Sequence, residues 1–319
     1  MKIFALTCGR KNANCEILVK EALNAAHHHG AEVEMVRLLD LDIKPCRICW
    51  PCPAMLKGPE GCIHKDDGPF LLDRIMECDG FILAAPVYSL TPPGYLLAIR
   101  DRILGPRADV ASLNEVKKMG HDPKFEKQGK MYVDERLFKR RVGALISVGG
   151  AATRHWTSLG LPVLHTLTFS ALINIVDQMD VIKVAEDGAI TLREDLLERA
   201  RRLGRNLVEA YNNPDESKAY LGDDGAVCPV CNTSLMMMYK GQSYVECSVC
   251  GIRGEVVVND GKLDVVFTEK DKEDSRYKYR GLKLHHDEVF EVSKEIEPFI
   301  KELPERMSKY KEYDKWILK

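Results

Sequence analysis

The sequence lacks long apolar runs, a strong excess of either charge, and a secretion signal. No apolar segment approaches the roughly 18–20 residues needed to span a bilayer, so no membrane association is predicted. The first residues, MKIFALTCGRKNANC, contain no charged-then-apolar leader, which favours a cytoplasmic location. With 46 basic and 48 acidic residues the formal net charge is −2, and this balance gives no support for nucleic acid as a partner.

The 11 cysteines are the most informative part of the composition. An odd number in a chain without a secretion signal argues against a disulfide framework. Most of the cysteines lie in two groups with CxxC spacing, which indicates metal or cluster binding in a reducing compartment. Hydrophobic residues (45%) and charged residues (29%) in 319 positions predict a globular protein of one large or two smaller domains.

Short apolar runs alternate with helical patterns through residues 1–212. The expected strands are residues 2–7, 32–38, 80–85, 141–148 and 173–184. The expected helices are residues 14–29, 68–77, 92 to about 103, 154–171 (interrupted or capped near Pro162) and 191–211. This order predicts an α/β domain with a doubly wound, five-stranded parallel sheet of the flavodoxin-like kind. Ligands of such sheets bind beyond the carboxyl ends of the strands.

Three other segments lie outside this minimal pattern. Residues 105–140 are too long for an ordinary connection and are expected to be a lid, a short helical excursion or a subunit contact. A polar linker at 214–225 precedes a small module at 226–267. Residues 284–319 are expected to form an amphipathic helical tail, bent near Pro298 or Pro304, that docks on the core or on a partner subunit.

Three loops follow strands of the predicted sheet and are candidates for ligand binding. The turn TCGRKNANC runs into a helix N-terminus, where backbone N–H groups and the helix dipole favour an anion. Tyr88, in the segment PVYS, offers a flat face to a planar heterocycle. Gly149 and Gly150 permit close backbone approach to a ligand. Each is a weak signal alone, but together they mark one edge of the sheet.

The first cysteine group is Cys46, Cys49, Cys52 and Cys62, with the spacing C-x2-C-x2-C-x9-C. Three thiolates at this spacing can face one cluster, and a fourth completes the ligands of a [4Fe–4S] cubane. Structural zinc and free thiols are the alternatives. The second group is Cys228, Cys231, Cys247 and Cys250, two CxxC pairs that can hold one tetrahedral metal. The residues between the pairs read as a hairpin. Rubredoxin-like iron is the alternative to zinc, and zinc is favoured because the glycine that usually follows the first rubredoxin knuckle is Asn232 here.

In their order along residues 1–200, these segments resemble the NADPH-dependent FMN reductase and iron–sulfur flavoprotein family. TCGRKNANC is similar to the family's GSPRKNGNT phosphate loop, AAPVYSLTPPGYLLAIRDR to SPVYFGSVPAQLKAFIDR, and VGALISVGG to its next strand and glycine turn. The resemblance implies FMN beside a subunit interface. It implies FMN contacts at Cys8, Arg10, Asn12, Asn14, Cys15, Pro86, Val87, Tyr88, Ser89, Gly149 and Gly150.

The sequence also departs from the family pattern. Cys8 and Cys15 replace the usual serine and threonine, and thiols are poor hydrogen-bond donors. Gly9 replaces the usual proline, and the gap before Cys62 is longer than in typical iron–sulfur flavoproteins. The backbone and Arg10 are therefore expected to bind more of the phosphate.

The residues and the resemblance together lead to one expected function and two alternatives. The first is an electron-transfer oxidoreductase in which a ferredoxin or NAD(P)H delivers electrons through a [4Fe–4S] cluster to FMN and then to an acceptor, in a homodimer or homotetramer. The second is a cluster-free NAD(P)H-dependent FMN or quinone reductase. The third is a non-catalytic scaffold or regulatory protein. No side chain is expected to act as a catalytic acid or base.

Overall fold

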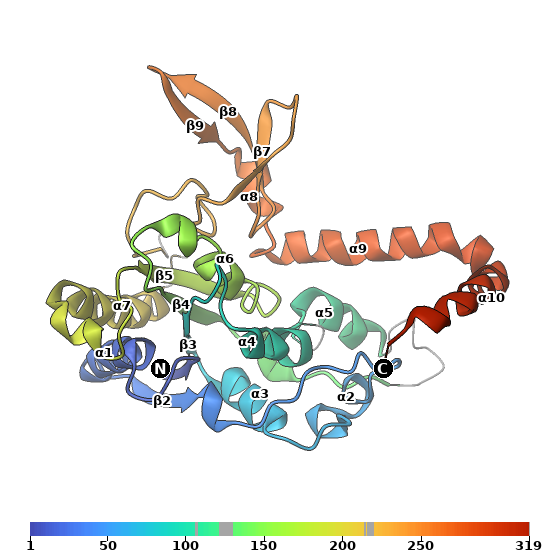
Figure 1. Cartoon of the computed structure of the whole chain (residues 1–319), viewed down its shortest axis with the longest axis horizontal. Coiled ribbons are helices and arrows are strands. Elements are labelled where there is room, and N and C mark those ends of the chain that lie inside the picture. The colour runs from blue at the N-terminus through green and yellow to red at the C-terminus, as the bar shows by residue number, and fades with distance from the viewer. Residues whose placement is uncertain (106–107, 121–129, 214, 216–219, 319) are drawn as a thin grey trace.

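The computed structural model describes residues 1–105, 108–120, 130–213, 215 and 220–318. Its main body is a five-stranded parallel sheet in the order β2-β1-β3-β4-β5 (Figure 1). The strands are β1 (Lys2–Thr7), β2 (Glu32–Arg37), β3 (Gly80–Pro86), β4 (Arg141–Val148) and β5 (Ile173–Val181). The predicted flavodoxin-like sheet is therefore confirmed.

Helices cover both faces of the sheet because its strands bury side chains in both directions. Phe4 and Leu6 of β1 point into one apolar core, whereas Ile3 and Ala5 point into the other. The second core lies under α1 (Asn14–His28) and α7 (Glu194–Asn212). The first lies under α3 (Gly68–Glu77), α4 (Gly94–Ile99), α5 (Val110–Met119) and α6 (Gly160–His165), and α4 continues into a π-helical turn at Arg100–Leu104.

Two predicted elements end earlier than the sequence pattern suggested. The helix expected at 154–171 is a 3-10 turn at Arg154–Trp156 followed by the short helix α6. After α6 the Thr166 and Thr168 hydroxyls bond to the carbonyls of Val163 and His165, which competes with helix propagation. β5 ends at Val181 because Lys183 has a left-handed backbone (φ 63°).

The module after the linker is a four-stranded antiparallel sheet with its own small core. Its strands are β6 (Met236–Met238), β7 (Tyr244–Cys247), β8 (Arg253–Asn259) and β9 (Lys262–Val266). The predicted hairpin between the cysteine pairs is the β6–β7 pair, whose turn contains Gly241 at φ 81°. A short helix, α8 (Glu269–Glu273), leads from this module towards the C-terminal helices.

The chain ends in an arm that leaves the body (Figure 1). The first turns of α9 (Tyr279–Ile296) pack on α5, where the Ser112 hydroxyl lies 3.1 Å from His286 Nδ1. A 3-10 segment at Glu297–Glu302, helix α10 (Leu303–Ser308) and a last 3-10 segment at Lys309–Trp316 follow. We call residues 289–318 the C-terminal arm. Pro298 and Pro304 each lie in the first turn of a new segment, which confirms the predicted helical tail.

The long segment 105–140 contains α5 and a 3-10 turn at Glu135–Phe138. Residues 106–107 and 121–129 lie outside the described part. The expectation that this segment forms a lid therefore stays a prediction. The described part includes a helical excursion, and it contacts α9 of the same chain.

Candidate functional site

The first loop reaches the carboxyl edge of the sheet with free backbone donors and an unpaired hydroxyl. Helix α1 begins after Ala13, which has no side-chain oxygen to cap it. The first N–H groups of α1 are thus without a side-chain cap, as suits an anion. The buried Thr7 hydroxyl at the end of β1 has no hydrogen-bond partner among the described residues. A ligand that brings acceptor oxygens to this loop would satisfy these donors.

The side chains predicted to surround the phosphate have different surroundings. Cys8 and Cys15 are buried, and burial raises the pKa of Cys8 well above its usual value and that of Cys15 to about 12. Both are therefore neutral thiols. The Asn14 amide donates to the Glu186 carbonyl (2.8 Å) and accepts from the Ile190 N–H (3.1 Å), so only its backbone remains for a ligand. Exposed Arg10 donates to Asp187 (2.7 Å) across the loop after β5.

A buried carboxylate that the sequence reading did not single out fixes the shape of this loop. Glu16 is fully buried, and it accepts from the Asn12 N–H (3.0 Å) and from Arg37 (2.7 and 2.9 Å). The Lys20 ammonium nitrogen lies 2.5 Å from Glu16 Oε1. Hydrogen bonds from Arg37, opposed by burial and aided by Lys20, lower the pKa of Glu16 from 4.5 to about 2. The bond to Glu16 holds Asn12 in its left-handed conformation (φ 57°).

The loops after β3 and β4 lie at the same edge. Val87 N–H donates to the Val148 carbonyl (2.9 Å), and Tyr88 and Thr91 form a tight turn with Ser89 at φ 49°. Pro86 ends β3, and the Tyr88 ring is 55% exposed. Tyr95 donates its hydroxyl to the Cys8 carbonyl, which joins this segment to the first loop.

The turn after β4 leaves little room for a Cβ at either of its two glycines. A Cβ on Gly149 would lie 2.3 Å from the Thr157 methyl carbon, and one on Gly150 would lie 3.1 Å from Ala185. Nearby, the buried Ser147 hydroxyl has no hydrogen-bond partner among the described residues. Trp156 is 59% exposed and stacks obliquely against His155 (5.4 Å between ring centroids). The three predicted loops thus meet at one sheet edge that offers backbone, hydroxyl and aromatic contacts.

The four N-terminal cysteines come together around one small cavity. Cys46, Cys49, Cys52 and Cys62 line it, and Cys62 is buried. Their sulfur atoms do not converge on a single point as closely as those of the second group. A cubane has a separate iron for each thiolate, so it does not require such convergence. His64 Nε2 and Arg102 Nε also line this cavity, and both are buried without a hydrogen-bond partner in the described structure. These donors suit the sulfides of a cluster.

Arg102 is held rigidly beside this cavity. It forms a buried ion pair with Asp66, with Nη2 2.5 Å from Oδ1, and donates to the Lys44 carbonyl (3.0 Å). Burial raises the pKa of Asp66, but hydrogen bonds from Arg102 and from the N–H groups of Lys44 and Gly68 prevail and lower it well below its usual range. The Arg102 guanidinium is therefore fixed next to the thiols, with its charge balanced by Asp66.

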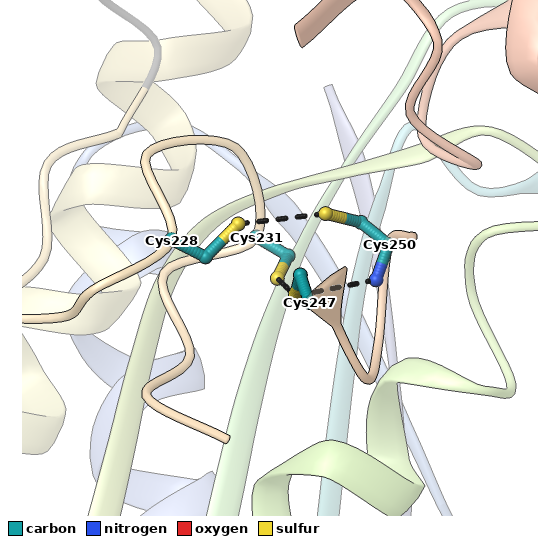
Figure 2. Close-up of side chains that lie close together, drawn as sticks. All are labelled: Cys228, Cys231, Cys247 and Cys250. Atoms are coloured by element: carbon teal, nitrogen blue, oxygen red, sulfur yellow. Dashed lines mark hydrogen bonds between the residues drawn. The ribbon is translucent and has the colours of Figure 1, made fainter. Parts of the chain in front are cut away.

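The second cysteine group forms a tetrahedral thiolate site (Figure 2). The sulfur atoms of Cys228 and Cys250 are 3.4 Å apart, as are those of Cys231 and Cys247, and all four lie within 4.8 Å of one another. A tetrahedral metal with bonds of about 2.3 Å separates its sulfur ligands by roughly 3.8 Å. The site thus fits one metal ion held by thiolates.

The two cysteine pairs sit on equivalent turns. Asn232 N–H donates to the Cys228 carbonyl (3.1 Å), and Gly251 N–H donates to the Cys247 carbonyl (2.9 Å). Both Asn232 (φ 54°) and Gly251 (φ 81°) have left-handed backbones. Asparagine tolerates this conformation better than most residues. The replacement of glycine at position 232 therefore leaves the turn intact and does not discriminate between zinc and iron.

A buried polar cluster joins the metal module to the main sheet. The Tyr277 hydroxyl lies 2.5 Å from His165 Nδ1 and 2.7 Å from the Thr168 hydroxyl. The Tyr277 ring packs against the first core of the main sheet and against the core of the metal module. His165 Nε2 lies 2.8 Å from Gln178 Oε1, and the Gln178 amide donates to the Asn232 carbonyl in the first turn. Burial lowers the pKa of His165 to about 4, so it is neutral here.

Comparison with known proteins identifies the family. The sequence model of the NADPH-dependent FMN reductase family matches residues 1–173. The chain belongs to this family. It is 34% identical over 292 residues to "Flavone synthase cfoJ" of Aspergillus candidus, which covers 89% of this chain and 87% of that protein. A solved structure of a "flavone reductase" matches with 26% identity and a TM-score of 0.78 over 98% of both chains.

Shorter matches link this FMN reductase family member to iron–sulfur flavoproteins. The iron–sulfur flavoprotein of Methanosarcina thermophila is 33% identical over 108 residues, which covers 34% of this chain and 54% of that protein. The protein is thus an FMN-dependent oxidoreductase with iron–sulfur flavoprotein relatives. No helix of its described residues is long and apolar enough to cross a membrane.

The sequence reading missed Glu16, His64 and Arg102. Glu16 carried a local signal, because an acidic residue in the first turn of a helix often bonds to the preceding loop. Arg102 lies in the family-like segment AIRDR, but its partner Asp66 is 36 residues away, so no local pattern could reveal the pair.

Proposed function

We propose that this FMN-dependent oxidoreductase exchanges electrons between a low-potential donor, ferredoxin or NAD(P)H, and a planar unsaturated organic molecule of the flavone type. The flavone-type molecule is proposed because of how much of the chain is similar to proteins of flavone chemistry. The two relatives that share nearly the whole chain are named for flavone chemistry. The iron–sulfur flavoproteins share only part of it. The exposed rings of Tyr88 and Trp156 at the sheet edge are consistent with a flat substrate.

The chain's own residues would hold FMN at the carboxyl edge of the sheet. FMN supplies hydride and single-electron chemistry when it is bound. The uncapped N-terminus of α1 and Arg10 would bind the phosphate, with the Thr7 hydroxyl as a further donor. Residues 86–89 would contact the ribityl chain and the ring, and Gly149 and Gly150 would allow the ring edge to approach the backbone. Neutral Cys8 and Cys15 would fill space under the loop.

We propose a [4Fe–4S] cluster on Cys46, Cys49, Cys52 and Cys62. Their shared cavity and the two buried nitrogen atoms without a partner, His64 Nε2 and Arg102 Nε, support it. We also propose zinc on Cys228, Cys231, Cys247 and Cys250, where it would stabilise a module with only a small core. In this arrangement residues 1–212 form the flavin domain, residues 226–267 the metal ribbon, and residues 284–319 the helical tail.

The alternative is a cluster-free enzyme in which NAD(P)H reduces FMN directly. The family that matches residues 1–173 is named for such a reaction, which favours this candidate over a non-catalytic scaffold. In this case the cysteines at 46–62 have a structural role.

The C-terminal arm supports a homodimer or homotetramer. Several of its large apolar side chains are exposed to solvent: Phe299 (51%), Met307 (64%), Tyr310 (57%), Trp316 (67%) and Leu318 (91%). Large apolar side chains exposed along one segment are typical of a surface that another molecule covers. Its charged residues are of both signs, so a second copy of this near-neutral chain is a better occupant than a strongly charged partner.

One experiment distinguishes these candidates. The protein is purified without oxygen, and one sample is used to measure its visible spectrum and its contents of flavin, iron, sulfide and zinc. The same preparation is then assayed for reduction of a flavone with NADH, NADPH or reduced ferredoxin as the donor. About four iron and four sulfide per chain with FMN and one zinc would support the cluster proposal. Flavin and zinc without sulfide would favour direct reduction by NAD(P)H. If the donor reduces the bound flavin but no flavone is reduced, the flavone assignment is refuted and the oxidoreductase proposal stands.

A further inference from the structure

The loop after β1 presents a row of backbone N–H groups without an acceptor. The backbone N–H groups of Gly9, Arg10 and Lys11 donate to no other group among the described residues. The next N–H along the loop, that of Asn12, donates to Glu16 (3.0 Å). Gly9 is also buried. A buried backbone N–H without a partner is rare in folded proteins, so that of Gly9 points to a ligand at this loop.

The side chains of the loop supply few donors of their own. Cys8 and Cys15 are buried neutral thiols, and thiols are poor hydrogen-bond donors. The Asn14 amide is occupied by the Glu186 carbonyl and the Ile190 N–H. The phosphate of FMN would therefore depend on backbone N–H groups, and the direction of each N–H is set by the peptide unit that carries it.

A side chain from another segment holds the first of these peptide units. Tyr95, in the first turn of α4, donates its hydroxyl to the Cys8 carbonyl. Partial burial raises the pKa of Tyr95 well above its usual value, so the hydroxyl stays protonated and can donate. The Cys8 N–H in turn donates to the Ala84 carbonyl of β3 (2.8 Å). Both bonding groups of the Cys8 backbone are therefore fixed.

The geometry of the peptide unit then sets the direction of the Gly9 N–H. The Cys8–Gly9 peptide is trans, and in a trans peptide the carbonyl and the following N–H point in opposite directions. The Cys8 carbonyl points to α4, on the side of the first core, so the Gly9 N–H is turned away from that side. α1 begins on the other side, where a Cβ on Gly9 would lie 3.0 Å from Cys15 Cβ. The Gly9 N–H and the first N–H groups of α1 thus serve the same side of the loop.

We propose that Tyr95 is a positioning residue for the flavin phosphate, because its bond to the Cys8 carbonyl orients the Gly9 N–H towards the phosphate that α1 and Arg10 would bind. The inference rests on the binding of FMN at this loop. It extends that proposal, since the segment after β3, which is expected to contact the ribityl chain and the ring, also shapes the phosphate site. Tyr95 thereby favours FMN over riboflavin, which has the same ring and ribityl chain but no phosphate.

Tyr95→Phe, which removes only the hydroxyl, tests this role. The dissociation constants of FMN and riboflavin for the full chain, after its flavin has been removed, are measured by quenching of flavin fluorescence. FMN should bind about fivefold to tenfold more weakly to the variant, because a hydrogen bond that orients a donor is lost, and riboflavin binding should change less than about twofold. Tyr239→Phe removes a hydroxyl that is bonded to Glu246 (2.8 Å) in the ribbon, and this matched control should change neither ligand.

A second measurement uses FMN alone. The phosphorus NMR resonance of bound FMN depends on the hydrogen bonds that its phosphate accepts. It should shift in Tyr95→Phe and stay in place in Tyr239→Phe.

An equal loss of affinity for FMN and riboflavin, no loss for either, or an unchanged phosphorus resonance would overturn the role of Tyr95 at the phosphate. Failure of the wild-type protein to bind FMN would instead refute the binding of FMN at this loop, on which the inference rests. The electron donor and the flavone assignment are decided by reduction of the bound flavin and of a flavone, so the two proposals can fail independently.

Discussion

The buried charge of Glu16 gives a quantitative prediction about the stability of the flavin-binding loop. Substitution Glu16→Gln keeps the side-chain shape and an acceptor for the Asn12 N–H, but it removes the charge that Arg37 and Lys20 neutralise. A shift of the Glu16 pKa from 4.5 to about 2 corresponds to roughly 3 kcal/mol. We therefore expect the variant to be less stable by about 3 kcal/mol at pH 7.

The sign of the pH dependence follows from the lowered pKa. A carboxylate with a depressed pKa stabilises the folded state above its unfolded-state pKa, and this contribution is lost as the pH falls through the folded-state value. Between pH 7 and pH 3 the difference between the wild-type protein and Glu16→Gln should therefore shrink by about 2 kcal/mol.

Equilibrium urea unfolding, followed by far-ultraviolet circular dichroism at several pH values, measures this difference. Glu21→Gln is the matched control on the same helix, because Glu21 forms only a partly exposed pair with Arg201, and such pairs contribute at most about 1 kcal/mol. A difference between wild type and Glu16→Gln that is independent of pH would refute the reasoning, since it would point to packing instead of charge.

Three further predictions concern the cysteine sites and the arm. Cys228→Ser should remove zinc and unfold the β6–β9 module while FMN stays bound, because thiolate zinc supplies roughly 10 kcal/mol to such modules; metal analysis with hydrogen exchange measures this, and retained zinc would contradict it. Cys49→Ser should abolish iron and sulfide without loss of flavin, and unchanged iron in anaerobically purified protein would count against the cluster. Deletion of residues 297–319 should convert the oligomer to a monomer in light scattering, whereas an unchanged subunit number would exclude the arm as the interface.

The fold was largely predictable from the sequence. All five strands of the main sheet were expected, and three of the predictions, at 2–7, 68–77 and 141–148, match the observed bounds. Buried parallel strands are continuous apolar runs, which makes them easy to locate. The helix expected at 154–171 is interrupted close to Pro162, as predicted, but it ends at His165 and not at Ala171, where two threonine hydroxyls bond to nearby carbonyls.

The site was predictable only where its residues are close in sequence. The two cysteine groups and the three loops were found from spacing and position, and the structure brings the members of each set together. The Arg102–Asp66 pair and the Tyr277–His165 contact were not predicted, because their partners come from distant segments. Such contacts depend on how layers pack, which no local pattern contains.

The position of β5 at the edge of the main sheet has a consequence for handling the protein. Among the described residues, the segment that leads into the ribbon lies along part of its outer side, where the Leu221 N–H donates to the Val176 carbonyl (2.8 Å). Exposed edge strands pair readily with strands of other molecules. If the ribbon binds a metal as proposed, its loss is expected to loosen this segment and open the edge to such pairing. The yield of soluble protein is then expected to follow the metal supply of the growth medium.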